Sequence, residues 1–196
     1  MTHPPALPRP LPRPVRLAAL AVVCLAAAAC GDDPFEVRWT ADPDTVLLYS
    51  LARPELNLPS AFNFLLRVAV PVESPNATGN WDVAVDTEDD RIVLLPPGAL
   101  HIDSRAAIAV IPGVDFDDVR EAPGDIDLYV TDEAVPVATG SVYVVQTHQS
   151  AGTFGRRCVY YAKVEPIEID VVLGTLRFLF DANPVCNDTR LVPPDD

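Results

Sequence analysis

The sequence predicts an all-β domain, an antiparallel β-sandwich, with a β-barrel as the alternative. Short apolar or alternating stretches recur along the chain, and stretches rich in Pro, Gly, Asn and Ser separate them. No window shows a sustained helical period, and many short strands with regular turns are typical of sandwiches and barrels. The predicted strands are residues 45–51, 62–70, 81–85, 91–95, 106–111, 126–131, 141–149, 157–164, 167–172 and 176–180.

Residues 62–70 show the strand pattern most clearly. Every second residue in this stretch is apolar: Phe62, Phe64, Leu66, Val68 and Val70. Alternate side chains of a strand point to opposite faces of its sheet. This period of two therefore predicts one long strand with one face buried in the core.

The C-terminal part of the chain predicts a β-hairpin that turns near Gly174. A turn at this position sets Ile169 opposite Phe178 on the apolar face and Asp170 opposite Arg177 on the polar face. Each such cross-strand pair contributes about 0.2–1 kcal/mol, so several pairs that agree define the register.

The first 29 residues have the layout of a secretory signal. They contain Arg9, Arg13 and Arg16 but no acidic residue, and they end in an apolar run at residues 17–29. This run is shorter than the roughly 20 residues that a membrane-spanning helix needs. We therefore expect residues 1–29 to be removed. A single β domain at residues 35–190 and a flexible tail at residues 191–196 complete the predicted organisation.

The end of this signal, Ala27-Ala28-Ala29-Cys30, resembles the lipobox of bacterial lipoproteins, which usually carry Leu where this chain has Ala27. The resemblance covers residues 1–33 only, and we recognise no family for the domain. It implies cleavage before Cys30, a diacylglycerol on that cysteine, and a short tether at residues 30–34. The implied location is the cell envelope, with the domain tethered to a membrane and lying in the periplasm or outside the cell. Ordinary signal peptidase, the alternative, would cut at the same bond and leave Cys30 unmodified.

The cysteine count bears on these alternatives. Of the four cysteines, Cys24 lies in the apolar run and is removed with it. Lipid on Cys30 leaves Cys158 and Cys186 as one pair, whereas an unmodified Cys30 leaves one thiol without a partner in an oxidising compartment. We therefore expect a Cys158–Cys186 disulfide that encloses the C-terminal hairpin and stabilises the domain by about 3–4 kcal/mol.

The charge of the chain limits its partners. The formal net charge is −14, and the charged residues that removal of the signal takes away are all basic. A surface this negative repels phosphate backbones, which excludes nucleic acid as a partner. The expected partners are the membrane, through the lipid on Cys30, and an envelope protein or a glycan.

Residues that could carry catalysis are sparse. The chain contains no nucleophile elbow, phosphate-binding loop, zinc-protease motif or dinucleotide fingerprint. After the signal, the only histidines are His101 and His148, and we expect His148 to face solvent from a predicted strand. Four aromatic residues offer either a carbohydrate platform or core packing: Trp39, Trp81, Tyr160 and Tyr161.

Two acidic groups are the candidate metal ligands. The first is Asp86, Glu88, Asp89 and Asp90, and the second is Asp115, Asp117 and Asp118. Loop carboxylates at such spacing can bind Ca²⁺ through hard oxygen ligands, although neither group has the EF-hand spacing. The alternative is a solvated acidic loop.

These observations favour a membrane-anchored domain with a non-enzymatic binding or accessory role and no resident cofactor. A Ca²⁺-dependent or carbohydrate-binding module is the first alternative. A hydrolase whose site does not show in the sequence is the second.

Mass spectrometry of the mature N-terminus tests the lipoprotein prediction. We expect the chain to begin at Cys30 and to carry the added mass of a diacylglycerol. A mature chain that begins at Cys30 with an unmodified thiol would instead indicate a freely secreted protein.

Overall fold

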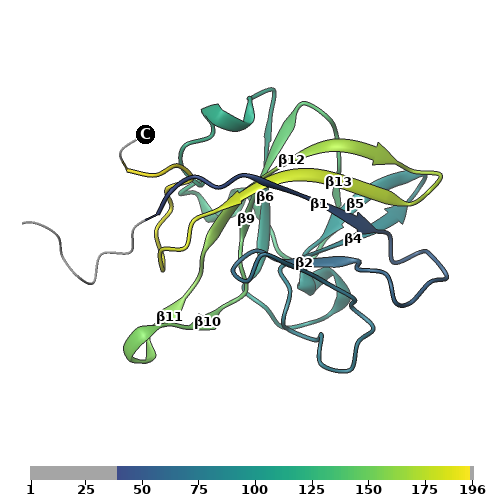
Figure 1. Ribbon diagram of the computed structural model, residues 1–196, viewed down its shortest axis with the longest axis horizontal. Coiled ribbons are helices and arrows are strands. Elements are labelled where there is room, and N and C mark those ends of the chain that lie inside the picture. Colours follow the sequence, from purple (N-terminus) through teal and green to yellow (C-terminus); the bar gives the residue numbers. More distant parts are fainter. Residues whose placement is uncertain (1–38, 195–196) are drawn as a thin grey trace, which may run out of the picture. The chain divides into compact units, whose positions relative to one another are not determined.

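The computed structural model describes residues 39–194, which form two antiparallel β-sheets packed on a shared core (Figure 1). This confirms the predicted all-β sandwich, and the barrel alternative is wrong because neither sheet closes on itself. One sheet has six strands in the order β1-β13-β12-β9-β6-β7, and the other has five in the order β3-β2-β4-β5-β8. The predicted signal and Cys30 lie outside the described residues.

The elements follow one another along the chain with short connections. In order they are β1 (Asp44–Tyr49), β2 (Ala61–Asn63), β3 (Val68–Val70), β4 (Val83–Glu88), β5 (Arg91–Leu95), η1 (Pro97–Leu100), β6 (Ala107–Pro112), η2 (Phe116–Asp118), η3 (Ile126–Leu128), β7 (Tyr129–Val130), β8 (Val135–Pro136), β9 (Ser141–Gln146), β10 (Ser150–Ala151), η4 (Thr153–Gly155), β11 (Arg157–Cys158), β12 (Tyr161–Asp170) and β13 (Thr175–Ala182). The η elements are single turns of 3-10 helix, and β10 and β11 pair only with each other.

Four phenylalanine rings organise the core between the sheets. Phe62 and Phe64 come from β2 and the turn after it, whereas Phe178 and Phe180 come from β13. The ring centroid of Phe62 lies 4.8 Å from that of Phe180 and 6.0 Å from that of Phe178, in edge-to-face geometry. Such aromatic contacts stabilise a core beyond the apolar area that they bury. The four rings therefore join one sheet to the other.

The predicted long strand at residues 62–70 is wrong. β2 ends at Asn63 and β3 begins at Val68, so the alternating residues fold into a tight hairpin. The Asn63 side-chain oxygen accepts a hydrogen bond from Leu66 N at 2.8 Å, and Arg67 has a positive φ of 54°. A period of two thus occurs here in a hairpin whose turn is held by an asparagine side chain.

The β12–β13 hairpin forms where it was predicted, but its register differs. Asp170 pairs with Thr175 and not with Arg177, so the turn is centred one residue earlier and both predicted side-chain pairs are wrong. Leu173 N donates a hydrogen bond to Asp170 Oδ1 at 2.8 Å, which fixes the earlier turn. Arg177 instead forms an ion pair with Glu168, with 3.3 Å between Nε and Oε2.

The predicted disulfide between Cys158 and Cys186 is present, with 5.0 Å between the Cα atoms. It joins the segment before β12 to the segment after β13 and thereby encloses the hairpin. Buried Asn183 shapes the return of the chain. Its Nδ2 donates to Arg190 O at 2.8 Å, and its Oδ1 accepts from Val185 N at 2.7 Å.

A second apolar cluster forms where η2 packs with the six-stranded sheet. Phe116 and Leu191 are both buried in it. Leu191, which the sequence assigned to the flexible tail, also donates its N–H to Arg120 O at 2.8 Å. The packed domain therefore extends beyond the predicted boundary at residue 190.

Lys163, the only lysine of the chain, lies beside this cluster and is 3% exposed. Its Nζ donates hydrogen bonds to Phe116 O at 2.8 Å and to Val119 O at 3.4 Å, and it lies 4.3 Å from the centroid of the Phe116 ring. Burial lowers the pKa of Lys163, while the charges of Asp117 and Asp181 oppose that shift. These contacts hold η2 against β12.

Replacing Phe178 with alanine should lower the free energy of unfolding by about 3–5 kcal/mol, because it opens a cavity among the four rings. Urea denaturation followed by tryptophan fluorescence measures this change. Phe154→Ala is the matched control: Phe154 is 97% exposed, so the same replacement there should change the free energy by less than about 0.5 kcal/mol. Equal losses in the two variants would contradict this description of the core.

Candidate functional site

A polar cleft with a volume of about 380 Å³ lies beside the end of β9. Its walls come from the loop after η1, from the residues that follow β9 and from β11. The lining residues are Gly79, Asp103, Ser104, Arg105, His148, Gln149 and Arg157. All but the glycine carry a polar or charged side chain, so groups able to bind a ligand gather here.

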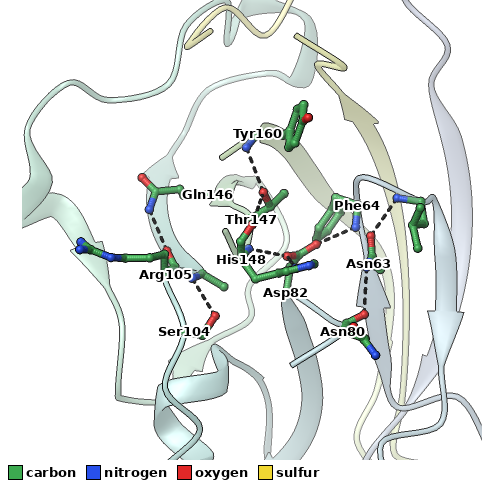
Figure 2. A network of polar contacts seen from close by, with 12 residues as sticks. Asn63, Phe64, Asn80, Asp82, Ser104, Arg105, Gln146, Thr147, His148 and Tyr160 are labelled. Atoms are coloured by element: carbon green, nitrogen blue, oxygen red, sulfur yellow. Dashed lines mark hydrogen bonds and ion pairs between the residues drawn. The ribbon is translucent and has the colours of Figure 1, made fainter. Parts of the chain in front are cut away.

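Asp82, which is completely buried, holds His148 in this cleft. Its Oδ2 accepts a hydrogen bond from Phe64 N at 2.7 Å. Its Oδ1 accepts from His148 N at 2.7 Å and lies 2.6 Å from the ring Nδ1 of the same residue (Figure 2). A buried carboxylate needs several donors to replace its lost water, and these contacts supply them. Asp82 thus joins the turn after β2, the start of β4 and the end of β9.

Asp82 fixes the position of His148 and raises the pKa of its ring. Because Nδ1 contacts the carboxylate, Nε2 is the ring nitrogen that remains for a ligand. The hydrogen bond to Asp82 raises the pKa of His148; burial opposes this shift, and the carboxylate charge adds to it. The side chain is 17% exposed. The prediction that His148 faces solvent is therefore wrong.

Hydrogen bonds from β9 and the residue after it fix the backbone around the cleft. Gln146 Nε2 donates to Arg105 O at 2.7 Å, which ties the segment after η1 to this strand. Buried Thr147 accepts a hydrogen bond from Tyr160 N at 2.9 Å through its Oγ1 (Figure 2). Arg105 and His148 therefore extend from backbone segments that are held in place before any ligand binds.

The cleft carries an excess of positive charge in a protein whose formal net charge is −14. Arg105 and Arg157 are exposed, and neither forms an ion pair with a carboxylate of residues 39–194. Asp103 is the one acidic residue that lines the cleft. Guanidinium groups bind carboxylates, phosphates and sulfates through paired hydrogen bonds. The cleft is thus equipped to hold an anion.

The first group of predicted calcium ligands lies along β4 and its turn into β5. Asp86 accepts hydrogen bonds from Ser50 Oγ at 3.1 Å and from Ala52 N at 2.9 Å. The other members are at the end of β4 and in the exposed turn: Glu88, Asp89 and Asp90. The contacts of Asp86 hold the loop after β1, which gives this carboxylate a structural role.

The second group of predicted ligands lies at η2. Asp115 precedes this turn of helix, Asp117 and Asp118 are within it, and all three are exposed. Across the part of the chain that the structure describes, no group of three or more His, Cys, Asp or Glu side chains is placed to hold a metal ion. Calcium binding stays a prediction without a preformed set of ligands.

The aromatic residues of the predicted carbohydrate platform do not form an exposed row. Trp39 and Trp81 are buried, and Tyr160 and Tyr161 are half-buried. His101 is exposed at the end of η1 and is not among the residues that line the cleft. These positions favour the packing role of the aromatic residues.

Sequence reasoning missed Asp82, Arg105 and Arg157 as site residues. Asp82 lies 66 residues before His148, so their contact depends on how the two sheets pack. One local signal does exist: Asp82 is an isolated charge within an apolar stretch that was predicted as a strand. A carboxylate in such a stretch indicates a buried group that needs partners. No comparable signal marks the two arginines.

No protein-family model, curated protein or solved structure matches this chain. None of the helices in residues 39–194 has the length and apolar character needed to cross a bilayer. The assignment of the cleft therefore rests on its own geometry and charge.

Asp82→Asn should lower the free energy of unfolding by about 3 kcal/mol, because it replaces a fully buried carboxylate that accepts hydrogen bonds from Phe64 N and His148 N. The folded-state pKa of His148 is raised, so its contribution to stability is complete below the unfolded-state pKa and is lost as the pH rises through the folded-state value. Wild-type stability should therefore contain a component that falls as the pH rises above about 6.5. The variant should lack this component.

Urea denaturation at several pH values on both sides of neutrality measures both effects. His101→Gln is the matched control, since His101 is exposed and lies outside the cleft. Parallel stability profiles for the wild type and Asp82→Asn would show that the carboxylate does not set the protonation of His148.

Proposed function

We propose that this protein is a bacterial envelope lipoprotein, tethered to a membrane by lipid on Cys30, that serves as a non-enzymatic binding domain. Its binding site is the cleft beside His148, which takes an anionic group of an envelope partner, a glycan or a protein. One observation carries the assignment of the cleft as the binding site. Arg105 and Arg157, which form no ion pair with a carboxylate of residues 39–194, share the cleft with a histidine fixed by buried Asp82.

The donors of the cleft define the chemistry of the ligand. Each guanidinium offers a planar fork that matches two oxygens of a carboxylate, phosphate or sulfate group. His148 Nε2 adds a third donor when the ring is protonated. Because Asp82 already fixes the ring, binding does not need to order it, which favours affinity.

The disulfide supports an exported location. Disulfides persist in oxidising compartments and are rare where thiols are kept reduced. With Cys158 and Cys186 paired, lipid on Cys30 accounts for the remaining cysteine of the predicted mature chain. The domain would then lie in the periplasm or outside the cell.

A hydrolase is the second candidate, and one observation favours it. Ser104 lines the same cleft as His148, and the contact between Asp82 and His148 Nδ1 is the one that orients histidine in catalytic triads. Ser104 Oγ, however, accepts a hydrogen bond from Ala106 N at 3.1 Å, and within residues 39–194 it has no hydrogen bond to His148. The geometry therefore favours anion binding over nucleophilic catalysis.

Titration with inorganic phosphate and sulfate tests the anion site. Calorimetry should detect binding to the wild type, and Arg105→Ser or Arg157→Ser should each weaken it about tenfold, because each removes a charge-assisted contact. Arg91→Ser is the matched control, since Arg91 is exposed at the start of β5 and does not line the cleft.

Two outcomes would contradict the proposal that the cleft binds an anion. Equal affinity in the wild type and both cleft variants would remove the cleft as an anion site. Covalent labelling of Ser104 by a fluorophosphonate, abolished by His148→Ala, would establish the hydrolase candidate in its place.

A further inference from the structure

The β10–β11 hairpin extends beyond the end of β9, away from the two sheets (Figure 1). Its base is braced, because Ser150 pairs with Cys158 and the disulfide connects Cys158 to Cys186. Gly152 N donates a hydrogen bond to Arg156 O at 2.7 Å, and a Cβ at Gly152 would collide with Cys158 Sγ. The hairpin is therefore a fixed projection of the domain.

Phe154 forms the tip of this projection and is 97% exposed. Its φ of 58° and ψ of 28° lie in the left-handed region, and Gly155 follows with a φ of 74°. Glycine, asparagine and aspartate favour this conformation, whereas a bulky aromatic residue is strained in it. An aromatic side chain held in a strained conformation and in water contributes little to the fold, which indicates a role in contact with another surface.

The charge of the hairpin is opposite to that of the chain. Residues 150–158 contain Arg156 and Arg157 but no aspartate or glutamate, while the chain as a whole has a formal net charge of −14. Both arginines are exposed, and neither forms an ion pair with a carboxylate of residues 39–194. The tip thus combines one exposed aromatic ring with two available cations.

We infer that this hairpin docks on the anionic surface of a lipid bilayer, with Phe154 entering the interface and Arg156 and Arg157 contacting headgroup phosphates. Arginine side chains reach headgroups along their apolar stems, and aromatic rings partition to this depth. The inference rests on the proposed lipid anchor, which keeps the hairpin close to the bilayer so that a weak contact is occupied. Repulsion of the acidic remainder of the domain would orient the hairpin towards the membrane.

A bilayer suits this tip better than a folded protein partner. Stable protein interfaces bury about 800 Å² on each side and contain a central cluster of anchor residues. Phe154 is the one large apolar side chain exposed among residues 150–158. A fluid surface, unlike a folded one, accepts a single aromatic wedge without a preformed pocket.

A tryptophan introduced by Phe154→Trp tests the inference in the mature full-length protein. The native Trp39 and Trp81 are buried, so quenching by brominated phospholipids reports on the introduced residue. We expect a blue shift and quenching with vesicles of phosphatidylcholine and phosphatidylglycerol, and little of either with phosphatidylcholine alone. Adding Arg156→Ser should lower partitioning about fivefold, whereas Arg91→Ser should leave it unchanged because Arg91 lies on β5.

Quenching that is equal in the two kinds of vesicle, or that survives Arg156→Ser undiminished, would overturn the inference. Absence of lipid on Cys30 would be detected separately, by mass spectrometry of the mature N-terminus. A protein without lipid should still show charge-dependent quenching at high vesicle concentration. The vesicle test varies Arg156, which does not line the cleft, so a negative phosphate titration leaves the vesicle result intact.

Discussion

The buried carboxylate of Asp82 is the contact on which the arrangement of the cleft depends. Its oxygens accept hydrogen bonds from Phe64 N and His148 N and contact the imidazole, so one side chain connects segments of both sheets. The aromatic core holds the sheets together through apolar burial, which has little directional preference. The carboxylate of Asp82 fixes the relative position of the segments that donate to it. The free-energy cost of burying it is offset only when all of its donors are correctly placed.

The cleft and the β10–β11 hairpin are both held in place by the disulfide. Arg157 lines the cleft and also belongs to β11, next to Cys158 of the disulfide. The covalent bond therefore positions one wall of the cleft and the base of the hairpin together. Because Arg157 belongs to both, contact of the hairpin with a surface would be coupled to the affinity of the cleft for an anion.

Sequence patterns predicted the parts of the structure that depend on local composition. Residues 91–95 form β5 as expected, and the cysteine count led to the correct disulfide. The hairpin at residues 62–70 was missed because Asn63 closes a turn within a pattern that a straight strand would also show. The cleft was missed because Asp82 and His148 meet only when the sheets pack, and no spacing along the chain encodes that contact.

The position of Lys163 has a consequence for the chemistry of the whole surface. The chain contains one lysine, and its ammonium group is enclosed beneath η2. Arginine, whose guanidinium remains protonated, supplies every other basic side chain apart from histidine. Amine-directed cross-linkers and acylating reagents consequently find no accessible ε-amino group on the described domain in its native state. A lysine-specific protease would likewise cut only molecules in which η2 has separated from the sheet by local unfolding. The rate of cleavage after Lys163 would therefore report how often that local unfolding occurs.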